Sequence, residues 1–323
     1  MLRKMHGIGL LVAVAVLTGG CALLEPFTGT TTSDSNAKFN LPEYKGVKHA
    51  VGCKDFDNQA GWHGSWHLGN NLSIMLESAL YDTGRFVVVE RKDLGEVLKE
   101  QDLVTSGRAA PAKQVAKTGL VRPARYLAGG SITVVEEGQS GGNAGISFGG
   151  VSLGGGKSKA QITIIAKLID TTTSQVVKKQ SITGKSGSVS LNVGLNFKGV
   201  STELGGFAKT PLGEAAQDCI NQAALFFAKE MEKLPVDACV VSAKDGKIII
   251  NRGAEYGIAA GQNYVMEELG EPQIDPNSGE LLGNLPGKVL GKIVVKSVQE
   301  KFSVCESVSG DKSPKQGTLV RAE

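Results

Sequence analysis

Apolar and polar residues alternate strictly through residues 188–198, SVSLNVGLNFK. A period of two places successive side chains on opposite faces of a β-strand, so the pattern predicts a strand with one apolar and one polar face. Five residues make up its apolar face: Val189, Leu191, Val193, Leu195 and Phe197. The 12 residues between Lys185 and Lys198 carry no charge, which is close to the ~9 to 11 that a tilted strand needs to cross a hydrocarbon core. The segment is therefore either a membrane-facing strand or a half-buried strand of a soluble β-sandwich.

A second uncharged stretch, residues 138–156, holds 19 residues, of which nine are glycine. Ile146 and Phe148 alternate with small residues, Gly149-Gly150 offers a two-residue turn, and Val151 resumes the alternation. This pattern predicts a hairpin with Ile146 and Phe148 on its apolar face. A flexible linker is the alternative, since the composition also suits one.

A return strand is expected over residues 200–209, which completes two hairpins, near residues 138–160 and 186–209. Two hairpins cannot close a barrel, and an open sheet edge in lipid leaves unpaired backbone groups, each at a high cost in free energy. Either the strands lie outside a membrane, or several copies of the chain share one barrel.

Residues 1–20 have the pattern of a bacterial lipoprotein signal peptide. Two basic residues precede the apolar run of residues 8–17, and small residues come directly before Cys21. We therefore expect Cys21 to be lipidated and to begin the mature chain, with an ordinary secretory signal as the alternative. Ala22, in place of an aspartate, is typical of lipoproteins sent on to the outer membrane.

Charge and hydropathy narrow the function classes further. Loss of Arg3 and Lys4 with the signal peptide takes the formal charge from +3 to +1, so nothing favours a nucleic-acid partner. A mean hydropathy of -0.04 and the lack of another long apolar run argue against a helical membrane protein. Residues 21–45, rich in Thr, Ser, Asn and Pro, are expected to tether the lipid to the first strand.

A compound motif lies at residues 86–100, FVVVERKDLGEVLKE, after an amphipathic helix predicted over residues 72–80. It resembles the F-x-x-x-E-R-x-x-L-x-x-[LV]-L-x-E signature of the curli-secretion channel family, the CsgG-like outer-membrane lipoproteins. Further segments match that family in order: YLAGGSI at 126–132, the strand and turn at 162–174, and the helix that opens at Thr210-Pro211 and contains Cys219. The resemblance covers about residues 45–235.

This resemblance implies an α+β fold in which a periplasmic α/β domain, residues 46–235, gives two hairpins to a shared transmembrane β-barrel. The implied partners are further copies of the chain in a ring, nonameric in the best-known member, together with outer-membrane lipid, an unfolded exported protein and periplasmic accessory proteins. No nucleotide or other cofactor is implied. Aligned backward from the first helix, the family's constriction loop falls on Trp62, His63 and Trp66, where its usual tyrosine, asparagine and phenylalanine are absent. An ordinary surface loop is the alternative for this segment.

Residues 236–323 are expected to form a small β-rich domain that slightly resembles the C-terminal domain of flagellar-assembly T proteins. Strands are predicted at 247–250, 264–268, 288–298 and 317–321. Cys239 and Cys305 lie in this domain, and an oxidising compartment makes a disulfide between them the expected pairing. Cys53 and Cys219 are expected to be buried thiols.

Enzyme signatures are weak. The run GGGKS at residues 154–158 approaches a phosphate-binding loop, but Val151 stands where that loop requires glycine. The histidines lack metal-ligand spacing, and no catalytic residue is predicted. Glu90 and Arg91 are expected to form a structural ion pair. The sequence thus predicts a non-enzymatic, ring-forming secretion channel of the outer membrane, with a poreless periplasmic scaffold for flagellar or envelope assembly as the alternative.

Overall fold

The computed structural model describes residues 39–42, 44, 46–110, 115–138, 147–148, 151–152, 159–187, 202–234 and 236–322. The chain divides into two units, Met1–Thr31 and Thr32–Glu323, and every described residue belongs to the second. The expected signal peptide, Cys21 and most of the tether lie outside the described residues.

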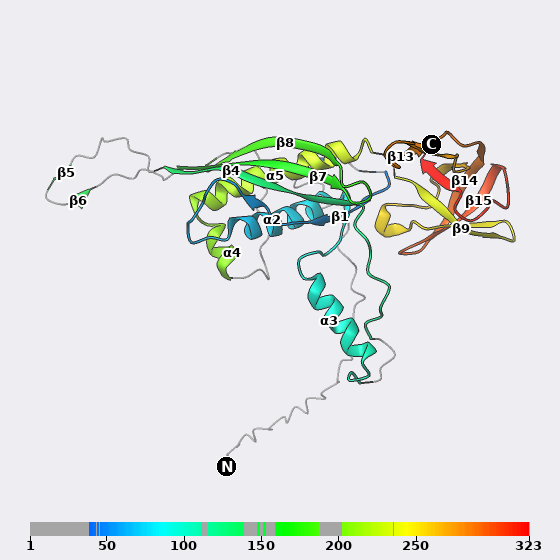
Figure 1. The fold of residues 1–323 in the computed structure, drawn as a ribbon, viewed down its shortest axis with the longest axis horizontal. Coiled ribbons are helices and arrows are strands. Elements are labelled where there is room, and N and C mark those ends of the chain that lie inside the picture. The colour runs from blue at the N-terminus through cyan, green and yellow to red at the C-terminus, as the bar shows by residue number, and fades with distance from the viewer. Residues whose placement is uncertain are drawn as a thin grey trace, which may run out of the picture. The chain divides into compact units, whose positions relative to one another are not determined.

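A mixed sheet forms the first domain (Figure 1). Its strands are β1 (His49–Cys53), β2 (Asp57–Asn58), β3 (Phe86–Val88), β4 (Tyr126–Gly138), β7 (Lys159–Asp170) and β8 (Val176–Lys185). The order is β3-β1-β4-β7-β8, with β2 paired to β4. Strands β1, β2 and β3 run parallel to their neighbours, whereas β4, β7 and β8 form an antiparallel meander.

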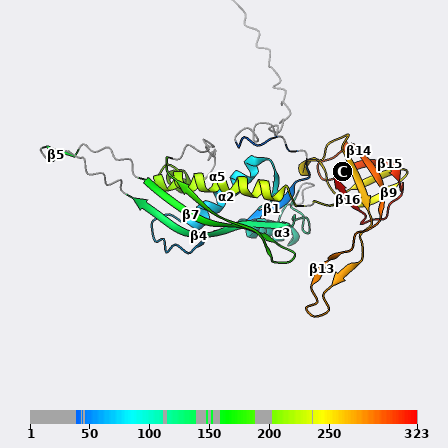
Figure 2. The same cartoon turned by 90° about the horizontal axis from the view of Figure 1, so that it is seen from above.

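Two helices, α2 (Leu68–Thr83) and α5 (Pro211–Met231), pack together and against this sheet, as Figure 2 shows from above. Helix α5 begins where Thr210 Oγ1 accepts a hydrogen bond from the Gly213 N–H, with Pro211 in its first turn. Helix α2 ends at Gly84, whose φ of 66° favours glycine. Strand β7 alternates buried and half-buried residues, so its apolar face lies in the core under the helices.

Gly184 allows β8 and α5 to approach closely. A Cβ at this position would lie 2.1 Å from the Ala215 carbonyl oxygen and 2.5 Å from the Cys219 nitrogen. Any side chain would therefore push α5 away from the sheet.

The expected return strand over residues 200–209 is wrong, because residues Thr202–Phe207 form a short helix, α4. Leu204 and Phe207 are three residues apart and both fully buried, which is the spacing of one helix face. In the sequence, Val200, Thr202, Leu204 and Ala208 alternate as on a strand, and Phe207 is the residue that breaks this alternation.

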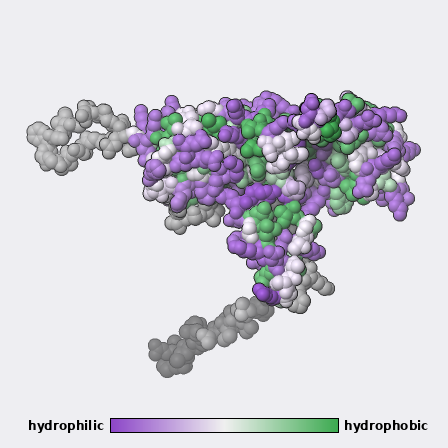
Figure 3. All heavy atoms as spheres, viewed as in Figure 1, coloured by the Kyte–Doolittle hydropathy of each residue, from purple (hydrophilic) through white to green (hydrophobic). Residues whose placement is uncertain are grey.

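Helix α3 (Leu94–Thr105) has a single buried residue, Gln101. Val97, Leu98 and Leu103 are each more than 40% exposed, and Figure 3 shows hydrophobic residues along this helix. None of the helices in the described ranges combines the length and apolar character that a membrane-spanning helix requires.

The C-terminal residues form a closed six-stranded barrel with the order β10-β15-β14-β11-β16-β9. Its strands are β9 (Ala238–Lys244), β10 (Lys247–Ile250), β11 (Asn263–Glu267), β14 (Val289–Val298), β15 (Ser303–Gly310) and β16 (Leu319–Ala322), with a 3₁₀ turn, η1 (Ala254–Tyr256). Inward-facing residues, among them Ile248, Met266 and Ile293, fill its core. A separate hairpin, β12 (Pro272–Ile274) and β13 (Leu281–Asn284), is inserted between β11 and β14.

The structure contradicts the expected disulfide, since Cys239 and Cys305 are both free. Cys305 is fully buried in the barrel core, where its neighbour across the ladder is Ile248. Cys239 is half-buried and alternates with the inward-facing Ala238 and Val240, so its side chain lies on the opposite face of the barrel wall. Two cysteines on opposite faces of a wall cannot be bridged without moving the backbone.

Candidate functional site

The meander ends where the first predicted hairpin begins. Strands β4 and β7 pair as far as Gly138 with Lys159, so residues 139–158 leave and rejoin the sheet on adjacent antiparallel strands. Within that segment, β5 (Ser147–Phe148) pairs with β6 (Val151–Ser152) in antiparallel register. The pairing of Phe148 with Val151 confirms the hairpin predicted around Gly149-Gly150; Ile146 and the Phe148 side chain lie outside the described residues.

The second predicted hairpin begins at the same edge of the sheet. Strand β8 ends at Lys185, which pairs with Gln161 close to the start of β7. The proposed lipid-facing residues of this segment, Val189, Leu191, Val193, Leu195 and Phe197, lie outside the described residues. Described structure resumes at α4. The first hairpin segment therefore leaves the sheet from β4 and the second from β8, on either side of the start of β7.

Charged residues surround these strand ends and line a cavity of about 990 Å³. The charged residues of its wall are Glu136, Lys159, Lys185, Lys209 and Glu214. Helix α5 holds the end of β8 here, because Asp218 accepts a hydrogen bond from the Lys185 N–H at 3.1 Å and Glu214 accepts one from the Gly187 N–H at 3.3 Å. We call this region the hairpin base.

A tryptophan loop, residues 61–67, lies between β2 and α2. The Asn58 side chain fixes it by donating to the Trp62 carbonyl at 2.8 Å and accepting from the Trp62 N–H at 3.3 Å. The Trp62 ring folds over Gly64, where a Cβ would lie only 2.0 Å from the indole. These contacts within the loop and with Asn58 define its conformation.

The two tryptophans of this loop are half-buried against the core, whereas His63 is exposed. The Trp66 ring lies 5.5 Å from the Phe207 ring, centroid to centroid, which ties the loop to α4 and so to the segment that follows the second hairpin. The Trp62 indole N–H is buried and has no hydrogen-bond partner among the described residues. The sequence pattern gave no sign of the contact between Trp66 and Phe207.

The Glu90 carboxylate and the Arg91 guanidinium bind backbone groups rather than each other, which corrects the expected ion pair. The Glu90 carboxylate accepts hydrogen bonds from the N–H groups of Lys92 and Asp93 at 2.5 and 3.0 Å, just before α3. The Arg91 guanidinium donates to the Arg122 carbonyl at 2.8 Å. These two positions of the motif thus shape the chain around α3 and have a structural role.

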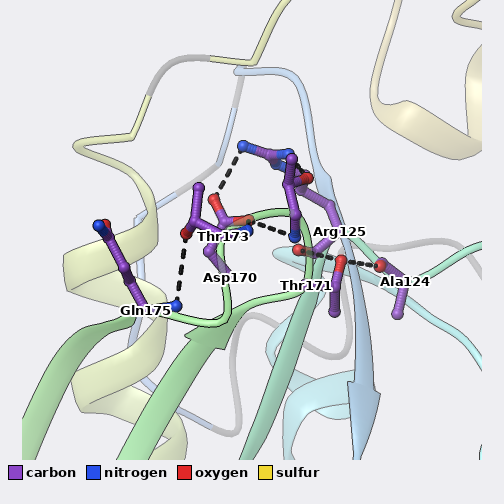
Figure 4. A network of polar contacts seen from close by, with 7 residues as sticks. Ala124, Arg125, Asp170, Thr171, Thr173 and Gln175 are labelled. Atoms are coloured by element: carbon purple, nitrogen blue, oxygen red, sulfur yellow. Dashed lines mark hydrogen bonds and ion pairs between the residues drawn. The ribbon is translucent and has the colours of Figure 1, made fainter. Parts of the chain in front are cut away.

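The turn between β7 and β8 is tied to the start of β4 (Figure 4). Thr171 Oγ1 donates to the Ala124 carbonyl at 2.8 Å, and Asp170 pairs with Arg125 at 2.8 Å. Asp170 also accepts a hydrogen bond from the Thr172 N–H at 2.7 Å. This network anchors the end of the meander that lies away from the hairpin base.

Within the residues that the structure describes, no group of three or more His, Cys, Asp and Glu side chains is placed to hold a metal ion. The chemical content of the region is therefore a charged hairpin base, an aromatic loop and two strand pairs that lead into amphipathic sequence.

A family model described as "Curli production assembly/transport component CsgG" matches residues 39–248. No curated protein matches the sequence. Among solved structures, the hypothetical protein CT253 from Chlamydia trachomatis is 10% identical with a TM-score of 0.33, over 56% of this chain and 97% of that one. The PelC dodecamer from Paraburkholderia phytofirmans is 14% identical with a TM-score of 0.28, over 56% of this chain and 88% of that one.

Proposed function

Because the chain belongs to the CsgG family of curli production assembly and transport components, we propose that it is one subunit of an outer-membrane secretion channel. In this proposal, several copies form a ring and each gives two hairpins to one transmembrane β-barrel. An unfolded polypeptide diffuses through the barrel, and the chain performs no enzymatic step and uses no cofactor.

The observation that carries the proposal is the register of the meander. Because β4 and β7 are paired up to Gly138 and Lys159, the intervening amphipathic segment continues from two adjacent strands of a well-formed sheet. Strand β8 ends beside them at Lys185 and leads into the segment with strict alternation. Sharing one barrel among copies satisfies every backbone group that a single pair of hairpins would leave open in lipid.

The charged hairpin base suits a position at the membrane surface. Lysine and glutamate side chains around the strand ends would remain in the polar layer while apolar side chains of the hairpins face lipid. A lipid on Cys21 would add an anchor to each subunit, and two such signals bind a membrane far better than one. The described domains would then lie in the periplasm, where accessory proteins and the exported chain reach them.

The tryptophan loop is the proposed constriction. Each subunit would place Trp62, His63 and Trp66 toward the pore, with His63 exposed and the two half-buried indoles presenting only their uncovered edges. A ring of such loops would set the pore diameter and its polarity. Anchoring of Trp66 on Phe207 would keep that diameter fixed.

A single charge on the lipid-facing side tests the proposal. Val193→Arg should cost about 2 to 4 kcal/mol per subunit at a bilayer midplane, and every subunit of a ring incurs this cost. Asn192→Arg, on the opposite face of the same predicted strand, is the matched control. We expect Val193→Arg to stay an unassembled, lipid-anchored subunit and Asn192→Arg to insert and form the ring, as measured by native gel electrophoresis of detergent extracts.

A poreless periplasmic scaffold is the second candidate. Its support is the C-terminal barrel, a separate β-domain most of whose strands lie beyond residue 248, where the family match ends. For a scaffold, both arginine variants would be equally mild, because neither position would enter lipid.

A further inference from the structure

The hairpin between β11 and β14 is a stiff arm, residues 268–288, outside the C-terminal barrel (Figure 2). Its base is narrow because Gly270 and Gly287 each approach a facing backbone oxygen so closely that a Cβ would lie within 1.8 Å. Its tip is a bonded turn in which the Asp275 N–H donates to the Glu280 carbonyl at 2.8 Å and the Asp275 carboxylate accepts from the Asn277 N–H at 2.8 Å. The arm is thus preorganised.

This arm exposes apolar and acidic side chains together. No residue of β12 or β13 is buried, and Ile274 and Leu281, which pair across the two strands, are each 53% exposed. Leu282 is 66% exposed. The arm carries four carboxylates and one lysine: Glu268, Glu271, Asp275, Glu280 and Lys288. Because neither face of this hairpin is covered within the chain, a partner surface that covers its apolar side chains would stabilise it further.

A surface of the opposite character lies elsewhere on the same chain. A cavity of about 890 Å³, which we call the cationic pocket, has five basic residues and one acidic residue in its wall: Lys48, Arg122, Arg125, Arg252, Lys301 and Asp237. Leu120, also in this wall, is 71% exposed, and Val121 beside it is 38% exposed. The pocket therefore offers positive charge next to apolar surface, which is the complement of the arm.

Part of this positive charge is not neutralised. Arg122 pairs with Glu255, and Arg125 pairs with Asp170. Arg252, Lys48 and Lys301 have no carboxylate partner in the part of the chain that the structure describes.

The Arg252 guanidinium is held in place although it is unpaired. It lies 4.6 Å from the centre of the Tyr256 ring and donates to the backbone oxygens of Asn251 and Asp237 at 3.0 and 3.1 Å. A fixed and unneutralised cation in a cavity is well placed to receive a carboxylate.

We propose that the arm of one copy docks in the cationic pocket of a second copy, so that neighbouring subunits of the ring are joined head to tail. The arm and the cationic pocket are both uncovered within one chain. Among the described residues, the arm makes one side-chain hydrogen bond to the first domain, from Gln175 to Glu280 at 3.4 Å. A contact between two different surfaces repeats from copy to copy and closes a ring when the rotation allows. This inference rests on the proposed ring and adds the contact that orders it.

Cysteine cross-linking between differently tagged full-length chains tests the contact. In a Cys239→Ser background, one chain carries Leu282→Cys on the arm and the other carries Leu120→Cys at the pocket. We expect a disulfide that joins the two tags in the detergent-extracted assembly. The matched control replaces Leu120→Cys by Lys244→Cys, an exposed position on β9, and should give none.

Charge reversal then tests the complementarity. Glu271→Lys with Glu280→Lys on the arm chain should slow formation of the disulfide several-fold, and Lys48→Glu with Lys301→Glu on the pocket chain should restore it. No disulfide between tags would overturn the docking, as would a disulfide that forms equally well with Lys244→Cys in place of Leu120→Cys. Native mass spectrometry of the same samples distinguishes failure of the arm contact from failure of the ring. An intact ring without the disulfide would contradict only the arm contact and would remain consistent with the channel.

Discussion

His49 is a buried titratable residue at the edge of the first domain. Its ring lies edge-on to Tyr126 with 5.2 Å between centroids, and its Nε2 is 3.3 Å from the Leu234 carbonyl oxygen. Burial lowers the pKa of His49, and the nearby Arg125 and Arg252 act in the same direction, while the contact with the Leu234 carbonyl opposes them. The folded chain therefore favours the neutral imidazole.

Stability should decline in mild acid for this reason. Because the pKa of His49 is lower in the folded chain than the ordinary value of about 6.5, the unfolded chain binds the proton more readily. The stabilisation is fully present above about pH 6.5 and is lost as the pH falls through that value toward the folded pKa. Urea unfolding at pH values between 7.5 and 5.5 gives the free energy of unfolding. This free energy should fall less steeply with pH for His49→Gln than for the natural chain, and equal slopes would contradict this account.

The thiols should differ in reactivity according to burial. Burial raises the pKa of Cys219 and of Cys305 to about 12 and raises that of Cys53 as well. Cys239 is only half-buried. Iodoacetamide at pH 8 should modify Cys239 first and the other three only when the chain unfolds, as followed by peptide mass spectrometry. If Cys239 and Cys305 were both protected and a reductant removed the protection of both, the two cysteines would form a disulfide and this account would be wrong.

At the scale of elements, the sequence predicts the helices and strands whose pattern of apolar residues fits only one kind of secondary structure. The motif at residues 86–100 corresponds to β3 and α3, and the apolar stripe at 72–80 lies within α2. Thr210 and Pro211 start α5 as expected. Strand β8 was not predicted, because its lysine pair interrupts the alternation. Helix α4 was taken for a strand on the alternation of residues 200–208, although Phe207 breaks that alternation.

The contacts that build the site were less predictable than its elements. Trp66 and Phe207 meet only because α4 packs beside the loop, and no local pattern links residues so far apart in the chain. Glu90 was identified from the motif, but its role as acceptor for the Lys92 and Asp93 N–H groups depends on backbone geometry. Sequence reasoning therefore proposed the segments of the candidate site and missed the contacts that hold them.

The close contact between β8 and α5 should make Gly184 intolerant of side chains. Gly184→Val would place a Cβ 2.1 Å from the Ala215 carbonyl oxygen, and overpacking of this kind costs about 1 to 3 kcal/mol. Gly138→Val on β4 is the control, since its Cβ would lie 3.8 Å from the Lys159 carbonyl oxygen, an ordinary van der Waals distance. The free energy of unfolding in urea should fall for the first variant and change little for the second; equal losses would refute the close approach.

At the scale of the whole molecule, three features join in the proposed ring. The meander would extend into the shared barrel, the tryptophan loop would narrow the pore, and the arm would order neighbouring subunits in the periplasm. Each rests on a different part of the chain, so each can fail separately. The pore is central, because the loop and the arm have a role only if the barrel forms.

Conductance of the detergent-extracted protein in a planar bilayer tests that central claim most directly. The account predicts large, uniform steps, and it predicts that replacement of Trp62 and Trp66 by alanine increases the step size by widening the constriction. Well-folded protein that produces no steps would contradict the channel and favour the poreless scaffold.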